Sequence, residues 1–105
     1  MDPDKIAHEL SKRGKAWAEL DQAASLLEET KKTVLAQCTL GANGSSQSSR
    51  ESTALASELY KSHVESMVEA RGKANIARIA FDVYRTYVEL LRTKAATDRA
   101  EMGMR

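Results

Sequence analysis

The sequence predicts an all-α protein: an antiparallel helical hairpin of two long helices that self-associates into a helical bundle or coiled coil. Apolar residues recur at every seventh position through residues 60–102, and arginines recur at the same interval. This pattern is typical of one long helix with a buried stripe. Residues 41–49 are rich in glycine and serine and separate this helix from an earlier one. We therefore expect a single helical-hairpin domain over residues 1–105, with helices at about 3–39 and about 50–101 and a Gly/Ser loop at 41–49.

The composition is that of a folded helical protein with little material for a large core. The chain of 105 residues is 42% hydrophobic and 30% charged but only 5% aromatic. Small domains of this kind usually need oligomerisation for stability, so we expect more than one chain in the functional unit. The net charge of +1 conceals a split, because residues 1–70 carry 8 basic and 11 acidic side chains and residues 71–105 carry 8 and 4. The two halves can pair, within one chain or between chains.

The first helix begins at a strong N-terminal signal. Asp2 suits the N-cap, Pro3 the first helical position and Asp4 the first turn, where negative charge is favourable. Its seam alternates spacings of four and three, with two basic interruptions, through Ile6, Leu10, Arg13, Trp17, Leu20, Ala24, Leu27, Lys31, Val34 and Cys38. Gly41 suits a left-handed C-cap at the end of this helix.

The second helix carries the heptad pattern. Ser48 and Glu51 fit a capping box at its start. The apolar series, taken as position a, is Tyr60, Met67, Ala74, Phe81, Val88, Ala95 and Met102, and position d then holds His63, Ala70, Ala77, Tyr84, Leu91 and Asp98. Position e, at the border of this stripe, holds the arginine edge, which is made of Arg71, Arg78, Arg85, Arg92 and Arg99.

A short connector predicts how the two helices meet. A loop of about ten residues lets them fold back antiparallel, so that residue i of the first lies near residue 90 − i of the second, to within about one turn. Trp17 then falls opposite Gly72–Ala74, where small side chains leave room for the indole. This packing would offset the loss of about 1 kcal/mol in helix stability that glycine causes relative to alanine. The same register places Asp21 near Arg71.

The apolar arc of the second helix is too wide for one neighbour. Between residues 74 and 91 it fills positions a, d, g and c, whereas a single partner helix covers a narrower stripe. The expected partners are other copies of the chain, as a dimer or higher oligomer, or a different protein. We predict an oligomer interface formed by Ile76, Phe81, Val83, Tyr84, Tyr87, Val88, Leu90 and Leu91.

The arginine edge has a structural and a functional interpretation. Its members can pair with carboxylates one turn away, as Asp82 does for Arg78 and Arg85 if the helix is regular. The alternative is a contact surface for a polyanion or an acidic partner, because the basic residues outnumber these carboxylates and arginine suits phosphate groups. Nucleic acid is therefore an alternative partner, ranked below protein.

No residue pattern of an enzyme or metal site occurs in the sequence. Glu-x-x-His and His-x-x-x-His are both missing, although these spacings are typical of di-iron bundles and zincins. Cys38 is the single cysteine, and no apolar run reaches 18 residues. We expect a non-enzymatic protein with no cofactor, no metal and no membrane association, acting in the cytoplasm.

One part of the second helix resembles a known class of proteins. It runs from Glu69-Ala-Arg-Gly-Lys-Ala-Asn-Ile-Ala-Arg through Glu89-Leu-Leu-Arg-Thr-Lys-Ala-Ala-Thr-Asp-Arg-Ala-Glu101. This segment, about a third of the chain, resembles the C-terminal half of small coiled-coil proteins encoded by tailed phages and prophages, some of them beside early recombination genes. The resemblance implies action in the host cytoplasm and no established activity.

The residues and the resemblance together predict an oligomeric helical interaction or adaptor protein that is phage-derived and acts through protein–protein contacts. The alternative is an accessory nucleic-acid-associated factor of phage DNA metabolism or recombination that uses the arginine edge.

Overall fold

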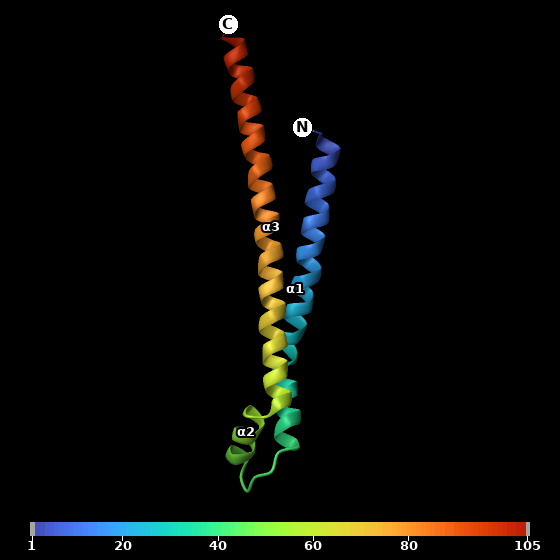
Figure 1. Cartoon of the computed structure of the whole chain (residues 1–105), viewed down its shortest axis with the longest axis vertical. Coiled ribbons are helices and arrows are strands. Elements are labelled where there is room, and N and C mark those ends of the chain that lie inside the picture. Colours follow the sequence, from blue (N-terminus) through green and yellow to red (C-terminus); the bar gives the residue numbers. More distant parts are fainter. Residues whose placement is uncertain (1, 105) are drawn as a thin grey trace.

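The computed structural model describes residues 2–104, which form three helices: α1 (Pro3–Leu40), α2 (Gln47–Leu55) and α3 (Glu58–Gly103). The predicted all-α class is confirmed, and the described part of the chain contains no strand. α1 and α3 lie side by side and run in opposite directions, and α2 lies at the end where they are connected (Figure 1). The molecule measures 86 × 21 × 15 Å. The C-terminal part of α3 extends beyond the start of α1 (Figure 1).

The capping of α1 agrees with the sequence at one end only. The backbone N–H of Asp4 donates to Asp2 Oδ1 over 2.9 Å, as expected of an N-cap. Gly41 follows the helix but is right-handed, with φ of −84° and ψ of −5°. Its N–H donates to the Gln37 carbonyl at 3.2 Å. The predicted left-handed cap is therefore wrong, because the helical hydrogen-bond pattern simply continues through this residue.

The region predicted as one helix from about residue 50 is divided in two. Ser46, not Ser48, caps α2, and its Oγ accepts the Ser49 N–H at 3.1 Å. A second break follows at Ser57, whose Oγ accepts the Tyr60 N–H at 3.2 Å and donates to the Ala54 carbonyl at 2.7 Å. A serine that satisfies backbone groups on both sides competes with helix continuation. The loop expected at 41–49 is correspondingly shorter, because α2 begins at Gln47.

The seam between α1 and α3 is narrow. All a and d positions of α3 from Tyr60 to Leu91 are buried or half-buried, as the heptad assignment predicts. The buried hydrophobic residues are nevertheless only Ala24, Ala54 and Ala74 among the residues described. The radius of gyration is 23.7 Å, against about 13 Å for a compact domain of this length. Two helices side by side therefore shield small side chains fully and large ones on one side only.

The pairing of α1 with α3 departs from the predicted one at Trp17. Trp17 packs against Phe81, with ring centroids 5.7 Å apart, rather than against Gly72–Ala74. The connection between the long helices spans residues 41–57, not 41–49, which moves its midpoint from residue 45 to residue 49. The Arg13–Ala80 and Asp21–Arg71 contacts nevertheless lie within one turn of the predicted pairing, so the departure at Trp17 does not extend along the whole helix pair.

The surroundings of the helical glycines also differ from the prediction. A Cβ added at Gly72 would meet no atom within 4 Å, so this glycine faces open space. A Cβ at Gly14 would lie 3.4 Å from Phe81 Cε2. Gly14, rather than Gly72, therefore faces an aromatic ring at the seam.

We predict that Gly72→Ala raises the free energy of unfolding by about 0.5–1 kcal/mol, because alanine restricts the unfolded chain and favours the helix. Leucine variants at Gly72 and at Gly14 separate the effect of helix propensity from the effect of packing at the seam. Gly72→Leu should be tolerated, whereas Gly14→Leu should lower stability by about 1–3 kcal/mol by displacing Phe81. Urea unfolding followed by circular dichroism measures all three variants. Destabilisation by Gly72→Ala would show that this glycine is packed.

Candidate interaction surfaces

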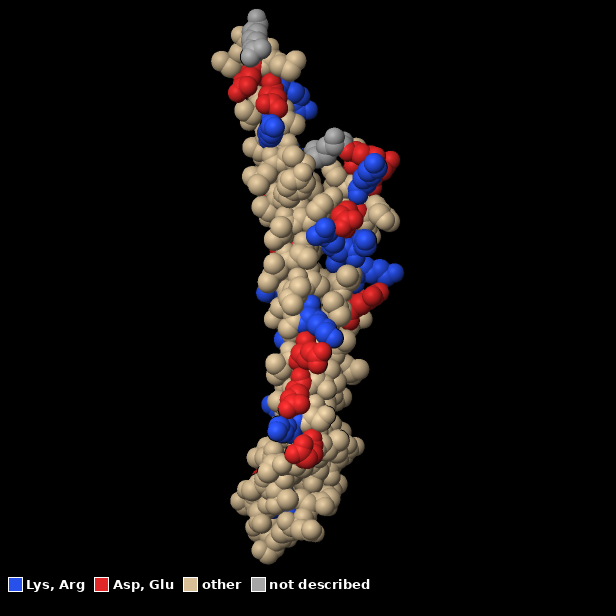
Figure 2. All heavy atoms as spheres, viewed as in Figure 1, with Lys and Arg blue, Asp and Glu red and all other residues tan. Residues whose placement is uncertain are grey.

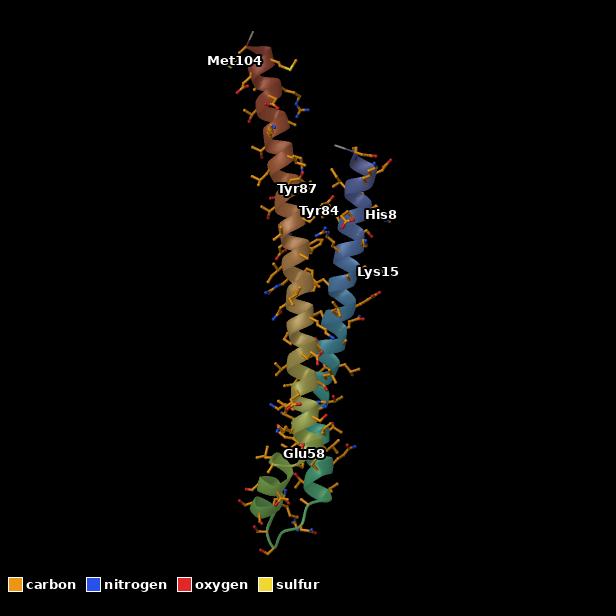
Figure 3. All side chains as sticks on the ribbon, viewed as in Figure 1. His8, Lys15, Glu58, Tyr84, Tyr87 and Met104 are labelled. Carbon is orange, nitrogen blue, oxygen red and sulfur yellow. The ribbon has the colours of Figure 1, made fainter. Side chains whose placement is uncertain are left out.

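Half of the residues predicted as an oligomer interface face α1 of the same chain. Phe81, Tyr84, Val88 and Leu91 are half-buried along the seam. The Arg13 guanidinium lies 4.8 Å from the centroid of the Tyr84 ring, which points from α3 toward α1 (Figure 3). A cation over an aromatic face is attracted by the ring quadrupole. These side chains are therefore engaged within one chain.

Arg13, an interruption of the apolar seam of α1, is held from both helices. Its Nε donates to Glu9 Oε1 over 2.7 Å, and its Nη1 donates to the Ala80 carbonyl of α3 over 3.3 Å. The hydrogen bond from Arg13, with its charge, lowers the pKa of the Glu9 carboxyl against a smaller effect of desolvation. The basic residue thus joins α1 to α3 at a seam position.

The other half of the predicted interface lies on the opposite side of α3. Ile76, Val83, Tyr87 and Leu90 are between 55% and 69% exposed. Ile79, which the prediction omitted, is 54% exposed on the same side. These residues form the outer stripe, defined as Ile76, Ile79, Val83, Tyr87 and Leu90.

The outer stripe has its own helical periodicity. Ile76, Val83 and Leu90 are seven residues apart at position c, and Ile79 lies at position f between the first two. Alternating steps of three and four residues form one face of a helix. The same period is visible in the sequence. The predicted interface omitted position f because the apolar arc was assigned to positions a, d, g and c only.

Arg71 of the arginine edge joins α3 to α1 by ion pairs. Its Nη1 donates to Asp21 Oδ1 over 2.6 Å, and its Nη2 and Nε donate to the two carboxylate oxygens of Glu28 over 2.7 and 3.0 Å. The proximity of Asp21 agrees with the sequence, whereas Glu28 was not foreseen. A planar guanidinium suits such bidentate contacts.

The pKa values follow from this geometry. The hydrogen bond from Arg71 lowers the pKa of the Glu28 carboxyl, and the positive charge adds to this effect against desolvation and the nearby Asp21 carboxylate. The same hydrogen bonds, first from Glu28 and then from Asp21, raise the pKa of Arg71. Glu28 and Arg71 are therefore charged at neutral pH.

The rest of the arginine edge is exposed. Arg85 lies 3.4 Å from Asp82 Oδ1, one turn away on the same helix. Within residues 2–104, Arg78, Arg92 and Arg99 have no carboxylate within 4.0 Å. Figure 2 shows basic and acidic side chains interspersed along the face in view, and almost no charge at the end that carries α2. Of the five arginines, Arg71 thus pairs with α1, Arg85 lies near Asp82 of its own helix, and the other three have no carboxylate partner among the described residues.

An open hollow lies between the C-terminal end of α1 and α2. Its volume is about 860 Å³, and its lining includes Leu35, Leu40, Leu55, Lys32, Arg50 and Glu51. Among the residues described, no group of three or more His, Cys, Asp or Glu side chains is placed to hold a metal ion. None of the three helices has a stretch long and apolar enough to cross a membrane.

Comparison of the chain with protein-family models, curated proteins and solved structures finds no match. The geometry of the chain offers two candidate surfaces for contact with another molecule. One is the outer stripe, and the other is the exposed part of the arginine edge.

We predict that Arg71→Gln lowers the melting temperature at neutral pH, because it leaves two carboxylates of α1 without their cation. The pKa of Glu28 is lowered in the folded state, so its contribution is complete above its ordinary value of 4.5 and is lost as the pH falls through the lowered pKa. The difference between wild type and Arg71→Gln should therefore shrink below about pH 4.5.

Arg78→Gln is the matched control for this series, because Arg78 is exposed and makes no ion pair within the described chain. It should leave the melting temperature nearly unchanged from pH 3 to 7. Thermal unfolding followed by circular dichroism gives both pH profiles. Equal effects of the two substitutions would show that the ion pairs of Arg71 with α1 do not stabilise the fold.

Proposed function

We propose that this chain is a non-enzymatic helical-hairpin protein that assembles with copies of itself and acts as an adaptor through protein–protein contacts. The outer stripe is the observation that carries this proposal. Its five large apolar side chains are between 54% and 69% exposed on one face of α3. Contiguous apolar surface of this kind marks interaction sites on soluble proteins.

The accessible surface of the chain supports the same proposal. It amounts to 7964 Å², whereas a compact monomer of 11.6 kDa exposes about 5,800 Å². The excess, about 2,200 Å² on one chain, is larger than the roughly 800 Å² that each partner buries in a standard interface. Association along the long axis would remove part of this surface from water.

The proposal extends to a phage or prophage origin and to action in the cytoplasm of the host. It is supported by the resemblance of residues 69–101 to small phage coiled-coil proteins. A protein partner would be identified by affinity capture from the native host followed by mass spectrometry, with an outer-stripe variant as the control bait.

We predict a mass of at least twice 11.6 kDa by light scattering at micromolar concentration, with a melting temperature that rises with concentration. Val83→Asp should reduce the mass to that of a monomer, because it places a charge at the centre of the outer stripe, which the proposed association would bury. Ala18→Asp, at an exposed position of α1, is the matched control and should leave the mass unchanged. A wild-type monomer, or dissociation by Ala18→Asp alone, would refute assembly through the outer stripe.

The alternative function is that of an accessory nucleic-acid-associated factor in phage DNA metabolism or recombination. The observation that favours it is the set of exposed arginines without carboxylate partners in the described chain, namely Arg78, Arg92 and Arg99. Arginine side chains spaced along a helix can contact successive phosphates.

This alternative predicts binding to single- or double-stranded DNA or RNA that is strong at about 50 mM salt and weaker by orders of magnitude at about 200 mM. Combined Arg78→Gln, Arg85→Gln and Arg92→Gln should abolish it at little cost in stability, because surface ion pairs contribute only a few tenths of a kcal/mol. Fluorescence anisotropy measures the binding. Absence of binding at the lower salt would leave a protein partner as the use of these arginines.

A further inference from the structure

We infer that a second copy of the chain docks on the outer stripe in parallel, with α3 alongside α3 and the two C-terminal ends together. This inference rests on the proposed self-association and adds the orientation of the partner. It follows from the position of the outer stripe on α3 and from the charges that flank it.

The outer stripe and the α1-facing seam occupy opposite sides of α3. Successive residues of an α-helix turn by about 100°, so positions c and f lie roughly opposite the a/d seam. Position f continues the line of the outer stripe through Thr86 and Thr93, which are exposed. A second α3 can therefore pack along c and f while each α1 stays on the outside, with no change in the α1–α3 contacts.

The flanks of the outer stripe carry opposite charges. Position b lies on one flank and holds Asp82 and Glu89, while position g lies on the other and holds Lys73 and Lys94, with Tyr87 of the outer stripe between them. Glu89 and Lys94 are exposed and make no ion pair with the described residues. In coiled coils, residues at these flanking positions set partner choice and orientation.

A parallel pair joins unlike flanks. Each residue at position b then faces the position g residue of the partner helix that lies five positions later in the sequence. Glu89 faces Lys94 of the second copy, and Asp82 faces the Tyr87 hydroxyl of the second copy. Both contacts occur twice because the pair is symmetric.

An antiparallel pair joins like flanks instead. Position b faces position b of the other copy, which brings Asp82 against either Glu89 or its own equivalent. Position g faces position g, which brings Lys73 near Lys94 in one of the two registers that align the outer stripe. Like charges at these positions oppose association. The flanking charges therefore select the parallel orientation.

The parallel pair has a consequence for the shape of the assembly. The part of α3 that extends past α1 ends near Met104 (Figure 3), and both copies contribute this part at the same end. Arg92, Lys94 and Arg99 of the two chains are then collected at one end of a long rod. The two α2 helices lie at the other end.

Cysteine cross-linking tests the orientation directly. In a Cys38→Ser background, Thr93→Cys places one thiol at position f of each chain. A parallel pair brings the two thiols together within the reach of a disulfide, whereas either antiparallel register separates them by about 25 Å or more along the axis. We expect mild oxidation to convert most of the protein to a covalent dimer on a non-reducing gel. Gln22→Cys, on the exposed face of α1, is the control and should stay monomeric.

A charge exchange provides the second measurement. Glu89→Lys should raise the dissociation constant of the dimer several-fold at low salt, and the added change Lys94→Glu should restore it. In an antiparallel pair Glu89→Lys would instead relieve repulsion and strengthen the dimer. Sedimentation at low and moderate salt gives these constants, and circular dichroism shows that each variant is helical.

The outcomes separate this inference from the proposed function. Covalent dimers of Thr93→Cys together with rescue by the charge exchange support the parallel pair. A dimer that cross-links only in a mixture of Ile79→Cys and Leu90→Cys chains overturns the orientation and leaves self-association intact. A monomer at micromolar concentration overturns both.

Discussion

The structure depends on the constraint that two helices lying side by side cannot enclose a core. Each helix has one face against the other and the rest in water, so only residues as small as Ala24 and Ala74 become fully buried between them. Larger side chains such as Trp17 and Phe81 pack on one side and stay accessible on the other. The excess accessible surface and the elongated shape both follow from this constraint, because nothing in the described chain covers the outer face of α3.

Polar contacts supply specificity where the apolar seam is thin. Arg71 reaches across from α3 to two carboxylates of α1, and Arg13 reaches back to the Ala80 carbonyl. Such contacts depend on geometry, whereas apolar packing along two smooth seams tolerates sliding. They help to fix one register out of several that would bury similar area. The seam and the two arginines thus hold α3 with its outer stripe turned away from α1.

The same geometry gives α3 two separate uses. Its inner face belongs to the chain itself, and its outer face carries apolar residues flanked by acidic side chains on one side and lysines on the other. The proposed assembly and its parallel orientation use only this outer face. The unpaired members of the arginine edge lie between the two faces, where either a partner protein or a polyanion can reach them.

The sequence by itself determined the helical class, the N-cap at Asp2 and the α1-facing seam, because heptad spacing and capping chemistry are local properties. It also placed Asp21 near Arg71. It missed the break at Ser57, since a single serine among helix-forming residues is a weak signal, and it placed Trp17 opposite Gly72–Ala74 although Trp17 packs against Phe81. Only the tertiary structure divided the predicted interface into inner and outer halves, because a heptad count shows which residues share a helix face but not which neighbour covers that face.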